Sequence, residues 1–268
     1  MNQRPGITYR KPSGFSQQAI RIWGLLFLMC GAAGFGLFAK GLIPANGGEN
    51  APIGMITMGM VLQVMHYCAI PVFSFLLVQG FLHTSSVKNY AIRVAILAVL
   101  TELPYNLCMT GNLLGAIKVS GGFGFDMASF SLNPVFATLL SLAVLAFFRQ
   151  YPGKETNKVF VKILVVVMAF LWAGMLRIEN ANIMLVLVAV LWAAREKKGR
   201  QVFFGCVATF LCSIFGLGTV ASIGCFAAPL TFLLLHFYNE EQGEGNMLIN
   251  YLAYPLILLA VGIATKFV

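Results

Sequence analysis

Residues 71–107 read PVFSFLLVQGFLHTSSVKNYAIRVAILAVLTELPYNL, and this stretch decides the fold class. An apolar helix that contains Pro71 runs into a short polar break, and a second apolar helix follows. The second helix carries Arg93 near its start and Glu102 near its end. Charged side chains within or beside a bilayer span are costly, so they usually serve a function. The stretch therefore predicts two membrane-spanning helices with polar groups at both membrane faces.

The whole chain has the composition of a membrane protein. Hydrophobic residues make up 59% of it and charged residues 10%, unlike an average soluble domain. Each spanning helix needs about 20 apolar residues, and the apolar residues come in long blocks without the alternation of a transmembrane barrel. The sequence predicts an all-α, polytopic transmembrane helical bundle with about nine spans. These lie at about 20–43, 53–81, 89–108, 128–148, 158–176, 180–194, 201–217, 219–238 and 247–266.

The pattern is consistent with eight, nine or ten spans. The sixth and seventh apolar blocks are short, and Gly216-Leu217-Gly218 obscures the junction between the seventh and the eighth. No linker between soluble domains is present in the pattern. We therefore expect a cytoplasmic N-terminal tail at 1–19 and one transmembrane domain at 20–268. The N-terminus does not resemble a cleaved signal, because mostly polar residues precede a span that is too long for a signal-peptide core.

The orientation follows from the positions of lysine and arginine, which concentrate in cytoplasmic loops. With nine spans and a cytoplasmic N-terminus, fourteen of the 18 basic residues lie inside. They are Arg4, Arg10, Lys11, Arg21, Lys88, Arg93, Arg149, Lys154, Lys158, Lys162, Arg195, Lys197, Lys198 and Arg200. The net charge of +9 is thus the signature of membrane orientation and requires no nucleic acid. The expected partners are membrane lipids and other membrane protein subunits.

Polar side chains in the spans sort into two groups by predicted depth. The inner group is Gln79, His83, Arg93, Tyr238 and Asn239, and the outer group is Glu102, Asn106, Asn133, Arg177, Glu179 and Asn182. One interpretation is a polar tunnel in which the inner group holds an anionic, phosphate-bearing donor. The outer group would then hold a polar acceptor, with Glu102 or Glu179 as proton acceptor. The alternative is that these side chains anchor the spans and bond helix to helix.

Several motifs in this order resemble the TraX family of bacterial membrane proteins, named for the conjugation protein that N-acetylates F pilin. The resemblance covers roughly residues 20–265, and its specific part is 71–139. It is carried by residues 71–81 (PVFSFLLVQGF) with His83-Thr84, 89–93 (NYAIR), 102–106 (ELPYN), 133–139 (NPVFATL), Tyr238-Asn239 and Tyr254-Pro255-Leu256.

The resemblance implies a membrane acetyl- or acyltransferase that takes an acyl group from cytoplasmic acyl-CoA. The acceptor would lie at or beyond the membrane, and no metal or prosthetic group is expected. If the protein is active, we expect Glu102 and His83 to be the acid and base. Arg93, Tyr238 and Asn239 would contact the donor. The acceptor would meet Asn133, Asn106, Arg177 and Glu179.

The chain departs from the family pattern at positions that look functional. Gly31 and Ala32 stand where the first helix of the family carries an Asp-His pair, which suits a base and its orienting group. Gln79, Gln242 and Ile257 replace a Glu, a basic residue and a His. The second hypothesis is therefore a catalytically degenerate scaffold or accessory subunit of a membrane complex. A third is a transporter of small molecules or lipids, for which Pro71 and Pro255 hint at broken helices.

Overall fold

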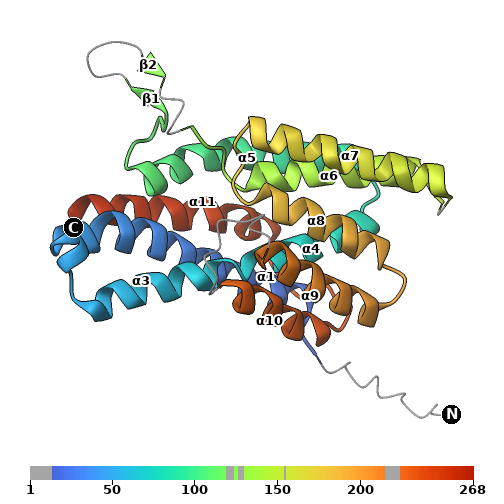
Figure 1. Ribbon diagram of the computed structural model, residues 1–268, viewed down its shortest axis with the longest axis horizontal. Helices are drawn as coiled ribbons and strands as arrows, with labels where there is room; N and C mark the ends of the chain where they lie inside the picture. The colour runs from blue at the N-terminus through green and yellow to red at the C-terminus, as the bar shows by residue number, and fades with distance from the viewer. Residues whose placement is uncertain (1–13, 119–123, 126–129, 154, 215–223) are drawn as a thin grey trace, which may run out of the picture.

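The computed structural model describes residues 14–118, 124–125, 130–153, 155–214 and 224–268. Most of these residues are helical (Figure 1). The helices are α1 (Gln17–Gly31), the π-helical η1 (Ala32–Leu42), α2 (Ile43–Ala45), the short η2 (Gly48–Asn50), α3 (Ile53–His66), α4 (Ala69–His83), α5 (Val87–Thr110), α6 (Val135–Gln150), α7 (Thr156–Met175), α8 (Ala181–Ala193), α9 (Lys198–Ile214), α10 (Gly224–His236), α11 (Met247–Ala264) and the terminal η3 (Thr265–Phe267).

Five helical segments are long and apolar enough to cross a membrane: Gln17–Ala45, Ile53–His83, Val87–Thr110, Thr156–Met175 and Ile249–Phe267. Three further apolar helices are shorter, at Val135–Gln150, Ala181–Ala193 and Ala227–His236. The helical membrane-protein class is thus confirmed. The count of nine spans and the cytoplasmic N-terminus stay predictions, and the Gly216-Leu217-Gly218 junction lies outside the described residues.

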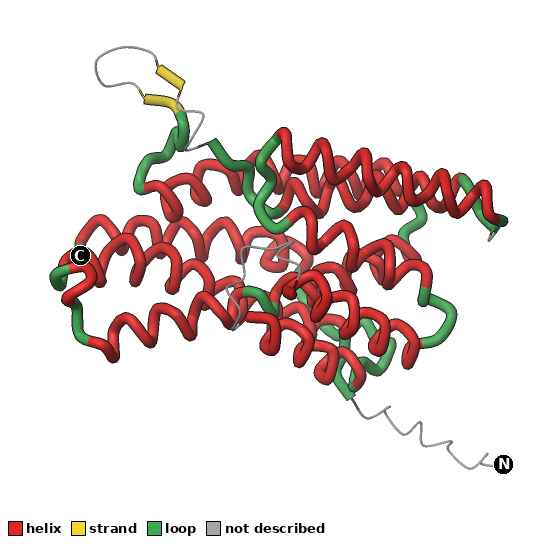
Figure 2. Tube along the Cα trace, in the orientation of Figure 1, coloured by secondary structure: helices red, strands yellow, loops and turns green. Residues whose placement is uncertain are grey.

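The helices run broadly along the long axis of the molecule (Figure 2). The C-terminus and the hairpin of β1 (Ile117–Lys118) and β2 (Gly124–Phe125) lie toward one end, and the connection between α6 and α7 lies at the other (Figure 1). The N-terminal segment is tied to the loop after α10, because Phe15 pairs with Tyr238. The segments before α6 and after α7 are tied by pairing of Leu132 with Ile178.

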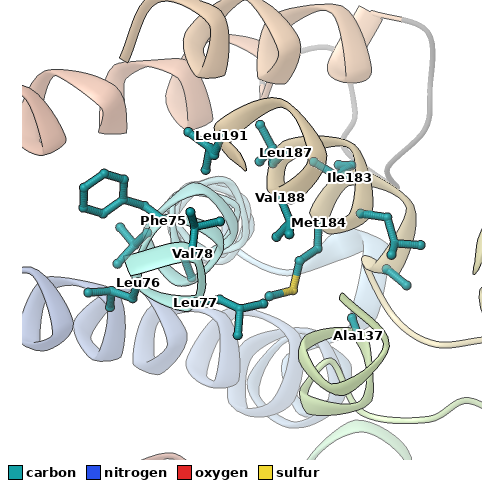
Figure 3. Packing of buried hydrophobic residues seen from close by; sticks show 14 of the residues in the cluster. Phe75, Leu76, Leu77, Val78, Ala137, Ile183, Met184, Leu187, Val188 and Leu191 are labelled. Atoms are coloured by element: carbon teal, nitrogen blue, oxygen red, sulfur yellow. The ribbon is translucent and has the colours of Figure 1, made fainter. Parts of the chain in front are cut away.

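Helices α4 and α8 form the centre of the bundle. Both are apolar on all sides, a pattern typical of helices buried from every direction. α4 packs against α1, α6, α8 and α10, and α8 against α4, α6, α7 and α9. In this core Leu77 of α4 lies beside Met184 of α8 (Figure 3), while the ring of Phe75 packs on Tyr238. Because lipid is as apolar as these side chains, close packing rather than escape from water holds such helices together.

The expected single span at 53–81 is interrupted between α3 and α4. Proline has no N–H, so Pro71 cannot donate the helical bond to the carbonyl of Tyr67. The turn before it tightens, with Tyr67 N donating to Val64 O at 3.2 Å and Cys68 N to Met65 O at 3.1 Å. The interruption places the end of α3 and the start of α4 at mid-length of this long segment.

The first long helix packs closely because small residues line it. A Cβ on Gly34 would lie 2.8 Å from Gln63 N, and one on Gly36 would lie 2.7 Å from Cys108 Sγ. Both glycines lie in the π-helical segment, where α3, α5 and α11 pack against it. The small-residue spacing of Ala32 and Gly36 predicts such close helix contacts.

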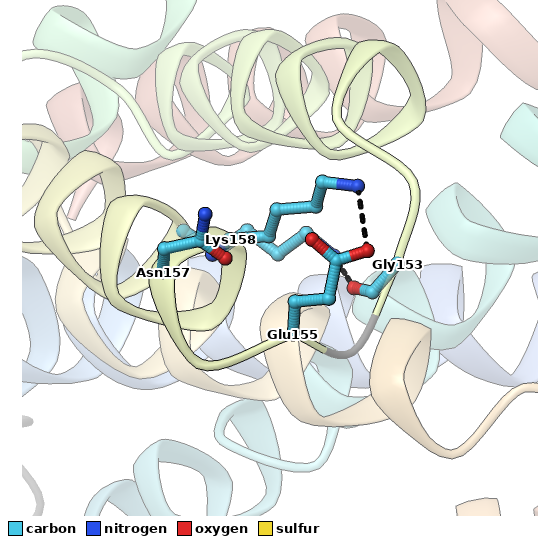
Figure 4. A network of polar contacts seen from close by, with 5 residues as sticks. Gly153, Glu155, Asn157 and Lys158 are labelled. Carbon is cyan, nitrogen blue, oxygen red and sulfur yellow. Dashed lines mark hydrogen bonds and ion pairs between the residues drawn. The ribbon is translucent and has the colours of Figure 1, made fainter.

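The first two turns of α7 carry basic residues that the orientation argument places in the cytoplasm. Lys158 forms an ion pair with Glu155 at 3.1 Å, and Lys162 donates to the carbonyl of Gly153 at 2.8 Å (Figure 4). Exposed pairs of this kind contribute about 0–1 kcal/mol. These contacts order the loop before α7 without adding much to stability.

Candidate functional site

A cavity of about 250 Å³ opens between α1, α4, α5, α6 and α11. Its middle is apolar and its two ends are polar. The first end is formed by Arg21, Tyr90, Asn250 and Tyr251, which lie near the starts of α1, α5 and α11. The second end is formed by His66, Thr138, Glu179, Asn180 and Tyr254. We call these the Arg21 end and the Glu179 end.

Glu179 is held in place from several directions. Its Oε2 accepts a hydrogen bond from Tyr105 OH at 2.6 Å, and that hydroxyl also lies 3.3 Å from Ser131 Oγ. Its backbone N–H donates to Leu132 O at 3.1 Å. The carboxylate therefore reaches the cavity from a fixed backbone and with one oxygen already bonded.

The backbone around Glu179 is unusual. Arg177 has φ 47° and Asn180 has φ 56°, both in the left-handed region that non-glycine residues rarely adopt. Such residues cost about 1–3 kcal/mol each and cluster at functional sites. The Arg177 carbonyl accepts from Leu132 N at 3.2 Å, so the neighbouring segment holds this turn. The short connection between α7 and α8 is thus built to present Glu179.

Glu102 and Asn133 bond to each other beside the cavity and do not line it. Glu102 Oε2 accepts from Asn133 Nδ2 at 2.6 Å and from Asn133 N at 3.2 Å. Asn133 Nδ2 also donates to Ala98 O at 2.8 Å, and Glu102 Oε1 accepts from Asn106 Nδ2 at 3.3 Å. This cluster joins α5 to the start of α6 and so fixes Pro134, which does line the cavity.

We expect Asn133→Ala to lower the free energy of unfolding by about 2–3 kcal/mol, because Glu102 would lose the side-chain amide from a buried site. Unfolding by SDS in mixed micelles measures this change. Asn46→Ala is the matched control, since that exposed amide donates to Leu42 O, four residues earlier in the chain. Equal stability of the two variants would show that the Glu102 cluster does not hold α5 to α6.

His66 is buried at the Glu179 end, although its sequence position gives little sign of a role. Its ring makes edge contacts with Phe35 and Tyr67, each with ring centres 5.7 Å apart. Its Nδ1 has no hydrogen-bond partner within the described part of the chain. Gly31 leaves the space that the ring fills, because any Cβ there would overlap the imidazole.

The predicted inner residues lie away from the cavity. His83 is exposed and its Nδ1 lies 2.8 Å from the carbonyl of Gln79. Arg93 is exposed, with its guanidinium 5.9 Å from the centre of the Tyr90 ring. Tyr238 is buried against Phe75, and Asn239 bonds to Glu241 in the same loop. The structure therefore joins Glu102, Asn106 and Asn133 of the outer group to one another, beside the turn that carries Glu179, and it does not gather the inner group. Across the described residues, no His, Cys, Asp and Glu side chains cluster as metal ligands.

The model of one protein family, described as TraX protein, matches residues 51–265. The chain belongs to the TraX family. The match covers α3 through α11, so it includes most of the helices that line the cavity. The comparisons with curated proteins and with solved structures found no match. Within this TraX-family protein, Arg21 lies on α1, outside the matched residues.

Proposed function

We propose that this TraX-family protein is a membrane-embedded acyltransferase of the bacterial cytoplasmic membrane. It would take an acyl group from cytoplasmic acyl-CoA and pass it to an acceptor at the membrane. The observation that carries the proposal is the cavity, which joins a cationic end on the predicted cytoplasmic side to a carboxylate in the α7–α8 turn. The apolar middle suits the flexible arm and the acyl group of such a donor.

The chemistry expected at Glu179 is general-base catalysis. Its free carboxylate oxygen would take a proton from an amine or hydroxyl of the acceptor as that group attacks the thioester carbonyl. The new bond forms to the acyl carbon, the carbon–sulfur bond breaks, and the leaving thiolate takes the proton back from Glu179. The products are the acylated acceptor and free CoA. A positioned base typically contributes about 10²–10⁴-fold to the rate.

The proposal differs from the sequence-based assignments at two residues, Glu102 and His83. Glu179 replaces Glu102 as the leading base, because Glu179 faces the cavity and Glu102 bonds to Asn133. His83 is exposed and lines no part of the cavity, so a role for it would require a donor bound outside. These roles remain proposals for experiment.

A non-catalytic scaffold is the second candidate, favoured by Gly31 and Ala32, which stand where the first helix of the family carries an Asp-His pair. The two are separated by incubating the purified protein in bacterial lipid with radiolabelled acetyl-CoA and membrane extract. Label transferred to lipid or protein, absent with Glu179→Gln, supports the acyltransferase. No transfer, together with a stoichiometric co-purifying subunit, supports the scaffold.

A further inference from the structure

The Arg21 end of the cavity is polar, and no described carboxylate pairs with the Arg21 guanidinium there. Arg21 projects from the second turn of α1 and lines the cavity with Tyr90, Asn250 and Tyr251. Its guanidinium is half-buried, and within the described residues no carboxylate forms an ion pair with it. A cation in a partly enclosed site is costly without a partner of opposite charge.

The neighbouring amides do not satisfy this guanidinium. Gln18 and Asn250 bond to each other reciprocally, with Gln18 Nε2 donating to Asn250 Oδ1 at 2.8 Å and Asn250 Nδ2 donating to Gln18 Oε1 at 2.9 Å. Within the described part of the chain, the one hydrogen bond of Arg21 runs from Nη1 to that same Gln18 oxygen, at 3.4 Å. Because a guanidinium has five N–H donors in a planar fork, most of its bonding capacity is unused.

An anionic ligand would complete the bonding of Arg21, and the rest of the cavity indicates what kind of molecule would carry that anion. Beyond Arg21 the wall is apolar, formed by Leu25, Leu28, Phe73, Val94 and Leu97, and it ends at Glu179. A ligand that fills it is anionic at one end and flexible and largely apolar along its length. Arg is the side chain best matched to phosphate, because its fork can donate two parallel bonds.

We propose that Arg21 binds the phosphate group of a phosphate-bearing amphiphile whose arm runs along the cavity toward Glu179. This assignment rests on the proposed function for the identity of the ligand as acyl-CoA. The same phosphate chemistry is offered by a phospholipid headgroup, whose chain would then occupy the cavity. Arg93 is not the phosphate ligand, since it lies exposed on Tyr90 and outside the cavity wall.

The test compares Arg21→Gln with Arg93→Gln, which removes the same charge from an exposed position near Tyr90 that does not line the cavity. Affinities of the purified protein in a phosphate-free maltoside detergent are measured for acetyl-CoA, for acetyl-pantetheine, which lacks phosphate, and for lysophosphatidic acid. We expect Arg21→Gln to weaken binding of a phosphate-bearing probe by about ten- to a hundredfold, the loss typical of a charged hydrogen bond. Arg93→Gln and the binding of acetyl-pantetheine should change less than about threefold.

The outcomes separate the inference from the proposed function. Arg21-dependent binding of acetyl-CoA supports both. Arg21-dependent binding of lysophosphatidic acid without acetyl-CoA binding supports the phosphate site and overturns the CoA donor. Wild-type affinity of Arg21→Gln for every probe, or no binding of any probe to the wild type, overturns the phosphate site. If Arg21→Gln does not fold, Arg21→Lys and displacement of acetyl-CoA by pyrophosphate give the same answers.

Discussion

Glu179→Gln is expected to reduce acyl transfer by about 10²–10⁴-fold, because an amide cannot take the proton of the acceptor. Glutamine keeps the shape of the side chain and can still accept the bond from Tyr105 at its remaining oxygen. The affinity for acyl-CoA should therefore stay near that of the wild type. Single-turnover transfer from labelled acetyl-CoA, measured beside equilibrium binding of the donor, separates these two quantities.

Glu102→Gln is the matched control for this experiment. Both carboxylates are half-buried, both have a side-chain hydrogen-bond donor, and they lie on the same side of the bundle. Because Glu102 is bonded to Asn133 and does not line the cavity, its variant should transfer within a few-fold of the wild type. The reverse pattern, with transfer lost in Glu102→Gln and kept in Glu179→Gln, would restore Glu102 as the base and contradict the assignment made from the cavity.

Gly31→Ala is expected to destabilise the protein by about 2–3 kcal/mol, although it adds a single methyl group. That methyl would overlap the ring of His66, which cannot withdraw freely because Phe35 and Tyr67 contact its faces and edges. Alanine elsewhere in a helix stabilises relative to glycine by about 0.5–1 kcal/mol. A loss of stability in Gly31→Ala, in place of the usual gain, would therefore indicate contact between the new methyl group and His66. SDS-induced unfolding measures it.

A double-mutant cycle with His66→Ala shows whether the clash is the cause. Removing the ring takes away the two closest contacts and leaves the Cβ of His66 at 2.9 Å from the new methyl, so the penalty of Gly31→Ala should be smaller in that background. Gly54→Ala is the control on α3, since a Cβ there meets nothing within 4 Å. A penalty for Gly31→Ala that is the same with and without the His66 ring would refute the packing of α1 on α3 described above.

The fold class was predictable because the bilayer imposes long apolar blocks, and the stretch 71–107 contains α5 from its first turn to Leu107 and nearly all of α4. The interruption at Tyr67 and Cys68 was harder to predict from the sequence, because a proline within a span can either bend the helix or break it. Pro104 lies inside α5 without ending it, whereas Pro71 follows a tightened turn.

The candidate site was predictable only in part. Sorting polar residues by depth placed Glu102, Asn133 and Glu179 at one level, and the structure does bring them to the same side of the bundle. It could not show that Glu102 and Asn133 satisfy each other while Glu179 faces the cavity. That division depends on the turn at Arg177 and Asn180, whose left-handed backbone has no clear sequence signal.

The positions of Arg21 and His66 at the cavity also could not be predicted from the sequence. Arg21 looked like one more cytoplasmic charge, and only the packing of α1 beside α5 and α11 makes it the wall of a cavity. His66 is a single histidine in an apolar segment, and Gly31, 35 residues before it, leaves the space that its ring fills. Both features arise from contacts between helices, which a single sequence does not display.

The most direct test of the account is the affinity of the purified protein for acetyl-CoA when the cavity is filled by a larger side chain. Leu97 lines the cavity, and its neighbour Ile96 on the same helix is 56% exposed on the outer surface. The account predicts that Leu97→Trp weakens binding at least about tenfold, equivalent to 1.4 kcal/mol, while Ile96→Trp binds as the wild type does. Equal affinity of both variants with the wild type would contradict a donor site in this cavity.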